Sequence, residues 1–156
     1  MNEALHIWLY DDLKEREEAR AAAIKDPNWD GPRAPSSMYV WNDSEVFHPA
    51  PFMRPWGGTQ ELGNIYEMRI YTYKPGTMPE VLKRWGEAIP YREKYSPLAA
   101  AWYTNVGGLN KFIHVWPYAN LAEREKIRAE ADMRTMAVGL IVHADQAERI
   151  LQKGQA

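Results

Sequence analysis

A repeated segment constrains the fold of this 156-residue chain more than any other feature. Residues 6–20 read HIWLYDDLKEREEAR and residues 114–128 read HVWPYANLAEREKIR, so aromatic, acidic and basic residues recur at equivalent places. In both copies a period of two gives way to a helical period after an Asp or Asn, which predicts a strand passing into a helix. The chain is therefore expected to contain an internal repeat of one structural unit.

Both predicted helices begin with the same capping pattern. Asp12 and Asn120 stand just before the helices, and Glu15 and Glu123 follow three positions later. The Asp or Asn side chain can accept a hydrogen bond from a first-turn amide, while the glutamate reaches back to the cap amide. These residues therefore mark where the helices start.

Periodicity and turn residues predict the remaining elements. Strands are expected at residues 5–10, 37–47, 64–73, 98–106, 112–116 and 138–143. Helices are expected at residues 13–25, 77–89 and 121–136, with Thr77 and Glu80 forming a capping box and Pro90 bending or dividing the second helix. From residue 64 the order is that of a ferredoxin-like unit, an antiparallel four-stranded sheet with two helices on one face.

Prolines and glycines between residues 49 and 58 predict a boundary within the chain. We expect a partial ferredoxin-like repeat at 1–56, containing only the second half of such a unit, a linker at 57–63, and a complete repeat at 64–156. A full first repeat would begin upstream of Met1, so the alternatives are a truncation, a misassigned start or a genuine short form. The N-terminal half should pack onto the complete unit or borrow strand pairing from another chain.

Composition argues against several classes of function. A formal net charge of −2 with interspersed charges gives no clustered basic face for nucleic acid. No apolar run approaches the roughly 20 residues that span a bilayer. The absence of cysteine excludes disulfides, thiolate metal sites and a cysteine nucleophile. A cytoplasmic location is the default expectation, and the seven Trp and nine Tyr suit cores, interfaces or ligand cavities.

Fragments in the right order along nearly the whole chain resemble the NIPSNAP family. They are YEMRIYTYKPG at 66–76, YREKY at 91–95, WYT at 102–104, GLN at 108–110, HVWPY at 114–118 and LAER at 121–124. The resemblance implies a dimeric α/β barrel, in which two ferredoxin-like sheets from two chains or two repeats close into a barrel with helices outside. It implies no settled catalytic activity, although the wider superfamily includes monooxygenases, isomerases and haem-using enzymes. Eukaryotic members are linked with mitochondria and with protein interactions in trafficking and organelle quality control.

The strand predicted at 64–73 carries the candidate site. Its side chains alternate, so Glu67 and Arg69 share one face and Met68 takes the other. The helices should cover the apolar face, which would turn the polar face toward the barrel interior, where a cavity with aromatic walls and a few polar groups suits a small molecule. The candidate pocket residues are Glu67, Arg69, Tyr71, Tyr103, Asn105, His114, Trp116 and Tyr118.

Two interpretations of these residues stay open. In the first, Glu67 holds Arg69 or acts as a base, and His114 transfers protons near neutral pH. In the second, Glu67 and Arg69 are an ion pair that fills the barrel, and His114 is a hydrogen-bonded interior residue. The recurrence of His, Trp and Tyr in both copies favours the second, since a feature repeated with the fold is explained by the fold.

No metal site or cofactor is predicted. The four histidines show no close spacing with other ligands, and haem on His114 rests only on analogy with the superfamily. The Glu/Arg-rich helices at 13–25 and 121–134 are expected to be solvated outer faces, or else to dock a protein partner.

The sequence thus predicts a NIPSNAP-like α+β homo-oligomer, a dimer, that binds or converts a small apolar or aromatic molecule in its barrel interior. The alternative is a non-catalytic interaction or scaffold module, so catalysis itself stays an open question. The expected location is cytoplasmic, with mitochondrial association if the source is eukaryotic.

Overall fold

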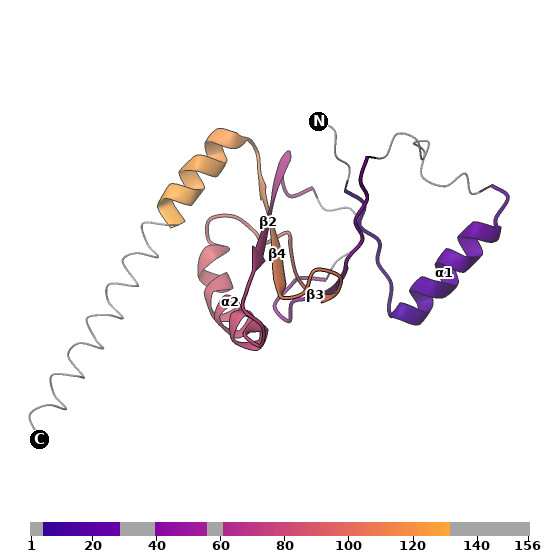
Figure 1. Cartoon of the computed structure of the whole chain (residues 1–156). Coiled ribbons are helices and arrows are strands. Elements are labelled where there is room, and N and C mark those ends of the chain that lie inside the picture. The colour runs from indigo at the N-terminus through magenta and orange to yellow at the C-terminus, as the bar shows by residue number, and fades with distance from the viewer. Residues whose placement is uncertain (1–4, 29–39, 56–60, 132–156) are drawn as a thin grey trace, which may run out of the picture. The chain divides into compact units, whose positions relative to one another are not determined.

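The computed structural model describes residues 5–28, 40–55 and 61–131, within two compact units, Met1–Asp43 and Ser44–Ala156. The elements are α1 (Leu13–Lys25), β1 (Val46–Pro49), β2 (Ile65–Thr72), α2 (Met78–Arg92), β3 (Ala100–Val106) and β4 (Lys111–Tyr118), followed by a helix over residues 121–131 (Figure 1). The fold class is α+β, as predicted.

The second unit is built on one open antiparallel sheet with the strand order β1-β3-β4-β2. β2 and β4 pair along their whole length, from Ile65 opposite Tyr118 to Thr72 opposite Lys111. In the chain, α2 comes between β2 and β3, and in the sheet β4 lies between these two strands. This is the order expected of a ferredoxin-like unit. The strand predicted at 138–143 lies outside the described residues, and the barrel, the dimer and the repeat stay predictions.

The first helix, α1, begins where its capping residues predict. The amide of Glu15 donates to Asp12 Oδ1 over 2.7 Å. The Glu15 carboxylate accepts from the amide of Asp11, one residue before the predicted partner.

The helix at 121–131 begins in the same way. The amide of Glu123 donates to Asn120 Oδ1 over 2.9 Å, and the Glu123 carboxylate accepts from the amide of Ala119. In both boxes the amide that donates to the glutamate therefore lies one residue before the predicted one. The two similar sequences thus form the same local structure.

The predicted capping box of α2 does not form, and Pro90 does not divide the helix. Thr77 already has helical dihedrals, φ −91° and ψ −9°, and makes no side-chain cap; its hydroxyl donates to the Lys74 carbonyl over 2.7 Å. Glu80 binds Arg84 instead. The helix also continues through Pro90, because a proline in the exposed last turn removes only one amide donor, and the next bond, from Glu93 N to the Ile89 carbonyl at 2.9 Å, still forms.

The strand predicted at residues 5–10 does not form, and the second N-terminal strand is shorter than expected. Residues 5–10 have no regular secondary structure and pair with no strand among the described residues. Within the described part of the strand predicted at 37–47, which is residues 40–47, only residues 46 and 47 are in β1, which pairs with β3. A single strand is not stable without a neighbour, so tertiary pairing decides which segments become strands. The predicted linker at 57–63 lies partly outside the described residues and stays a prediction.

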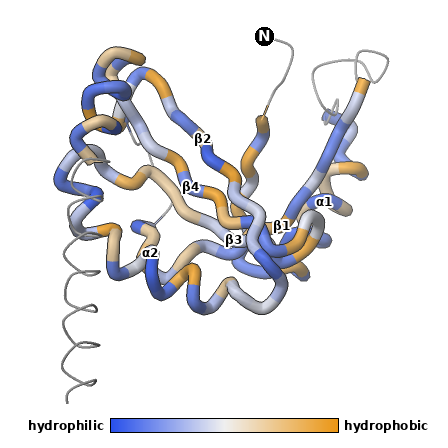
Figure 2. Tube along the Cα trace, turned by 60° about the vertical axis from the view of Figure 1, so that its left-hand side comes forward, coloured by the Kyte–Doolittle hydropathy of each residue, from blue (hydrophilic) through white to orange (hydrophobic). Residues whose placement is uncertain are grey.

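Helices cover the opposite sheet face from the one expected. Figure 1 shows α2 and the helix at 121–131 on the same side of β2 and β4. The main core lies on this side and contains Val81 and Ile89 of α2 with Phe112, Trp116 and Tyr118 of β4. Figure 2 shows that hydrophilic and hydrophobic residues alternate along β2. Glu67 of β2 forms an ion pair with Arg124 of the helix at 121–131, so the face that bears Glu67 is the helix-covered one. The prediction that the helices cover the apolar face is wrong.

The helix-free face carries a separate apolar cluster. Buried Trp102, Ile113 and Val115 form its centre, with Ala99 and Ala100. Met53, Leu62 and Met68 pack against this cluster. Each face of the sheet thus has its own core, and the described helices of the second unit cover one of them.

Candidate functional site

Strands β2 and β4 bring six of the eight candidate residues onto one sheet face. Glu67 lies opposite Trp116, and Arg69 lies opposite His114. Side chains directly opposite each other in an antiparallel pair share a face. The six residues on the helix-covered face are Glu67, Arg69, Tyr71, His114, Trp116 and Tyr118.

The other two candidates lie on β3, where Tyr103 packs against the same core as Trp116 and Tyr118. Tyr103 lies opposite Phe112 and is half-buried, and its ring is 5.6 Å from the ring of His48. Asn105 is exposed, near the turn that joins β3 to β4. The structure therefore does not gather all eight predicted residues into one site.

His114 is enclosed by aromatic rings. Only 1% of its surface is exposed, and its ring centroid lies 4.5 Å from that of Trp85, 5.1 Å from that of Tyr71 and 5.6 Å from that of Phe112. Trp116 Nε1 donates to His114 Nδ1 over 2.5 Å. A neutral imidazole that accepts at Nδ1 carries its proton on Nε2. That buried Nε2 has no hydrogen-bond partner in the described part of the chain.

This environment keeps the imidazole uncharged. Burial lowers the pKa of His114 from 6.5 to about 4, and the nearby Arg69 guanidinium adds to the effect. A group that titrates near pH 4 is not poised to exchange protons at neutral pH. The structure therefore favours the interpretation of His114 as a packed interior residue.

Glu67 is held by two arginines from the helix at 121–131. Its Oε1 accepts from Arg124 Nη2 and, over 3.3 Å, from Arg128 Nη1. Burial alone would raise the pKa of the Glu67 carboxyl, but the hydrogen bond and charge of Arg124, with the charges of Arg128 and Arg69, hold that pKa below its ordinary value. Arg124 and Arg128 lie one turn apart, so one carboxylate fixes the helix to the sheet.

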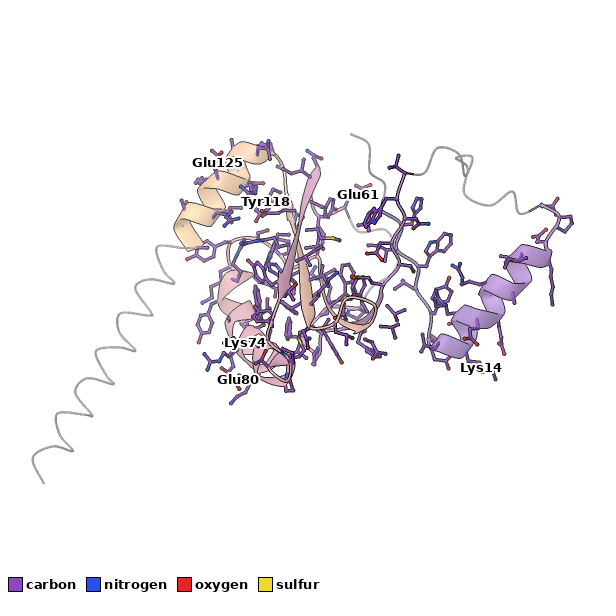
Figure 3. All side chains as sticks on the ribbon, viewed as in Figure 1. Lys14, Glu61, Lys74, Glu80, Tyr118 and Glu125 are labelled. Atoms are coloured by element: carbon purple, nitrogen blue, oxygen red, sulfur yellow. The ribbon has the colours of Figure 1, made fainter. Side chains whose placement is uncertain are left out.

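Arg92 ties α2 to β4. Its guanidinium lies 4.2 Å from the ring centre of Trp116 and donates to the Tyr118 hydroxyl over 3.3 Å. Burial raises the pKa of Tyr118, so its hydroxyl stays protonated at neutral pH. Figure 3 shows Tyr118 at the end of β4, close to the start of the following helix.

The sequence reasoning missed the residues that the helices contribute to this layer. Trp85, Arg92, Arg124 and Arg128 complete the group. A signal for two of them was present, because both copies of the repeat place arginines one helical turn apart. An acidic residue on the covered strand is what such a pair requires.

We call Glu67 with Arg124 and Arg128 the clamp, and replacing Glu67 by glutamine tests it. We expect the free energy of unfolding to fall by about 1 kcal/mol at pH 7, because Glu67 and its arginines are 20–30% exposed and solvent screens the pair. Glu80→Gln, at an exposed pair within α2, is the matched control and should cause no measurable loss. Urea unfolding followed by circular dichroism measures both, and equal effects would contradict the clamp.

Two open grooves lie elsewhere on the second unit. One, of about 430 Å³, has Tyr118, Tyr95, Ser96 and Glu123 among its lining residues. The other, of about 550 Å³, lies between α2 and the segment that contains Phe52. Neither is lined by Glu67, Arg69 or His114. Of the eight candidate residues, Tyr118 alone lines one of these two grooves.

The described residues offer no arrangement for a metal ion. None of their His, Asp and Glu side chains form a group of three or more that could hold one. Haem ligation by His114 finds no support in this packing, since aromatic rings surround the imidazole on the helix side of the sheet.

Among the described residues, no helix combines the length and apolar character needed to cross a membrane.

Fold and site together define an α+β protein in which helices clamp a charged and aromatic layer onto one face of an open antiparallel sheet. The chain belongs to the NIPSNAP family, whose family model matches residues 1–54 and 66–152.

Proteins of several animals are similar in sequence to this chain. Protein NipSnap of Drosophila melanogaster is 30% identical over 132 residues, which cover 84% of this chain and 48% of that protein. NipSnap homolog 1 of Danio rerio is 40% identical and NipSnap homolog 2 of Homo sapiens is 38% identical, each over 68 residues that cover 44% of this chain and 24% of the relative. The chain thus spans less than half the length of these relatives. No solved structure matches it.

Proposed function

We propose that this chain is a self-associating binding module. Two copies would bring their helix-free sheet faces together into a barrel, and the chamber between them would take up a small apolar or aromatic molecule. The observation that carries the proposal is the apolar side of β2, where Tyr66 is 48% exposed and Ile70 is 56% exposed. Contiguous exposed apolar surface of this kind marks interaction sites.

On the neighbouring strands the same face is also apolar, with Phe47 of β1 37% exposed. Trp102 and Val115 lie in the buried cluster of this face, and Phe47 of β1 stacks on Trp102 with ring centroids 6.3 Å apart. Apolar and aromatic walls favour an apolar or aromatic ligand. Tyr66, Ile70, Phe47 and Trp102 bring no carboxylate, imidazole or ammonium group to this face. Binding is therefore the chemistry that the face supports, rather than acid–base conversion.

Native mass spectrometry of the intact chain tests both parts of the proposal. A dimer that carries a reproducible small molecule supports the binding module and identifies the ligand class. An empty oligomer supports a scaffold, and a protein that stays monomeric at high concentration contradicts the barrel.

The variant Ile70→Asp localises the interface. A carboxylate at this exposed apolar position would be buried without a partner on association, so we expect the dimer to weaken at least about tenfold. Leu109→Asp is the matched control, since Leu109 is 60% exposed on the turn between β3 and β4. Sedimentation equilibrium measures the dissociation constants, and equal values for both variants would place the interface elsewhere.

The second candidate function is a non-catalytic protein-interaction module. It is favoured by α1, which buries none of its residues although it has the capped structure of its counterpart at 121–131. A helix of this kind needs a surface to pack on before it can contribute to a core.

A further inference from the structure

Residues 5–20 have a counterpart whose binding partner is known from the structure. In the repeat, His6, Trp8 and Tyr10 correspond to His114, Trp116 and Tyr118. Likewise, Arg16 and Arg20 correspond to Arg124 and Arg128. The second copy pairs with β2, whose Glu67 lies opposite Trp116 and is held by Arg124 and Arg128. The second copy thus shows which kind of strand this sequence binds.

The first copy has the same local geometry without the strand. Its capping box, from Asp11 to Glu15, has the same hydrogen bonds as the box at the start of the 121–131 helix. Arg16 and Arg20 follow their aromatic segment at the same spacing along the chain as Arg124 and Arg128 follow theirs. This matched spacing makes residues 5–20 a preformed half of the clamp.

The tryptophan of the first copy is exposed to solvent, whereas that of the second copy is buried. Trp8 is 64% exposed, whereas its counterpart Trp116 is 2% exposed. Arg16 and Arg20 make no ion pair with any described residue, although Lys14 pairs with Glu18 at 3.8 Å on the same helix. Exposed apolar residues, followed in the same segment by two guanidinium groups that pair with no described residue, form an incomplete binding surface.

The chain's own β2 does not fill this role. Its hydrogen bonds on one side go to β4 over all eight residues, and Glu67 Oε1 already accepts from two arginines. A strand that completed the first copy in the same way is therefore not β2 of the same chain.

We infer that residues 5–20 bind an extended strand of another polypeptide that has the Glu-x-Arg pattern of β2. The strand pairs antiparallel with residues 5–10, placing its glutamate opposite Trp8 and its arginine opposite His6, as in the pairing of β2 with β4. Arg16 and Arg20 hold the glutamate. This interaction uses a different surface from the proposed barrel interface and goes beyond that function.

A labelled peptide tests the inference directly. The probe is the synthetic peptide of residues 64–74, NIYEMRIYTYK, added to the full chain and followed by fluorescence anisotropy. We expect saturable binding, with hydrogen-exchange protection at residues 6–10. The Glu67→Gln peptide should bind about tenfold more weakly, because a charge-assisted hydrogen bond becomes a neutral one. Absent binding, or equal binding of the two peptides, overturns the inference.

Charge reversal identifies the arginines. The full chain carrying Arg16→Glu and Arg20→Glu should lose binding of the parent peptide and gain binding of the Glu67→Lys peptide. The control chain carries Lys14→Glu and Lys25→Glu, which make the same change in charge on the same helix. Circular dichroism confirms that both variants keep their helices. If both variants bind the parent peptide equally, or if the lysine peptide restores nothing in a folded arginine variant, the inference is wrong.

Discussion

Replacing Trp116 by alanine is expected to lower the free energy of unfolding of the second unit by about 3–5 kcal/mol. Trp116 is 2% exposed in the core between the sheet and α2. Its ring lies under the Arg92 guanidinium, and its Nε1 donates to His114 Nδ1. The substitution removes all three interactions and leaves a cavity. Since small domains are stable by only about 5–15 kcal/mol, urea unfolding should show a large shift of the midpoint.

The repeat supplies a matched control for this experiment. Trp8 has the same sequence context as Trp116 but is 64% exposed, so Trp8→Ala should change the stability by less than about 0.5 kcal/mol. Trp116→Phe keeps most of the ring volume and removes the donor to His114, and should cost about 1–3 kcal/mol. Equal effects of the two alanine variants would mean that Trp116 does not belong to the core.

Local sequence signals were sufficient for part of the fold. The alternation along β2 and the turn after β3 gave correct strands, because the turn uses residues suited to positive φ, with Gly107 at 104° and Asn110 at 61°. Asp12 correctly marked the start of α1. Each of these features depends on a few neighbouring residues, and such features can be predicted without knowledge of the tertiary structure.

The two copies of the repeat show where local reasoning stops. The sequence around Trp116 is a buried strand because β2 and β3 lie on either side of it, whereas the similar sequence around Trp8 has no strand beside it among the described residues and is not a strand. The same residue pattern therefore has two outcomes. Strand formation is decided by pairing across long sequence separations, which the pattern itself does not contain.

The sequence predicted which residues share one face of β2 but not what covers that face. The alternation grouped Glu67 with Arg69 correctly, but assigned this group to the helix-free side because covered faces are usually apolar. Arg92, Arg124 and Arg128 from the helices give this polar face partners, although Glu67 Oε2 and His114 Nε2 have none among the described residues. Buried polar groups are allowed where partners exist, and these partners lie at least twenty positions away from β2 along the chain. The ligand-binding role of the candidate pocket residues stays a prediction.

Acidification is expected to destabilise the second unit through His114. The pKa of this imidazole is about 4 in the folded chain, against 6.5 for an ordinary histidine, because it is buried and lies near Arg69 and Arg92, with Glu67 opposing their effect. The unfolded chain therefore binds the proton more readily below pH 6.5. The contribution of His114 to stability is fully present above pH 6.5 and is lost as the pH falls toward 4. The expected loss over this window is about 3 kcal/mol.

The variant His114→Gln separates this contribution from the other titrating groups. Glutamine takes up no proton, so the variant should be less stable than the parent at pH 7 but should lose less stability between pH 6.5 and 4. His48→Gln, at an exposed position, should keep the parent's pH dependence. Urea unfolding at pH 7, 5.5 and 4 gives the change of the free energy of unfolding with pH for the parent and the two variants. If His114→Gln and the parent lose stability equally, the imidazole is not held neutral by burial, and the packed layer around it is more open to water than its contacts with Trp85 and Tyr71 indicate.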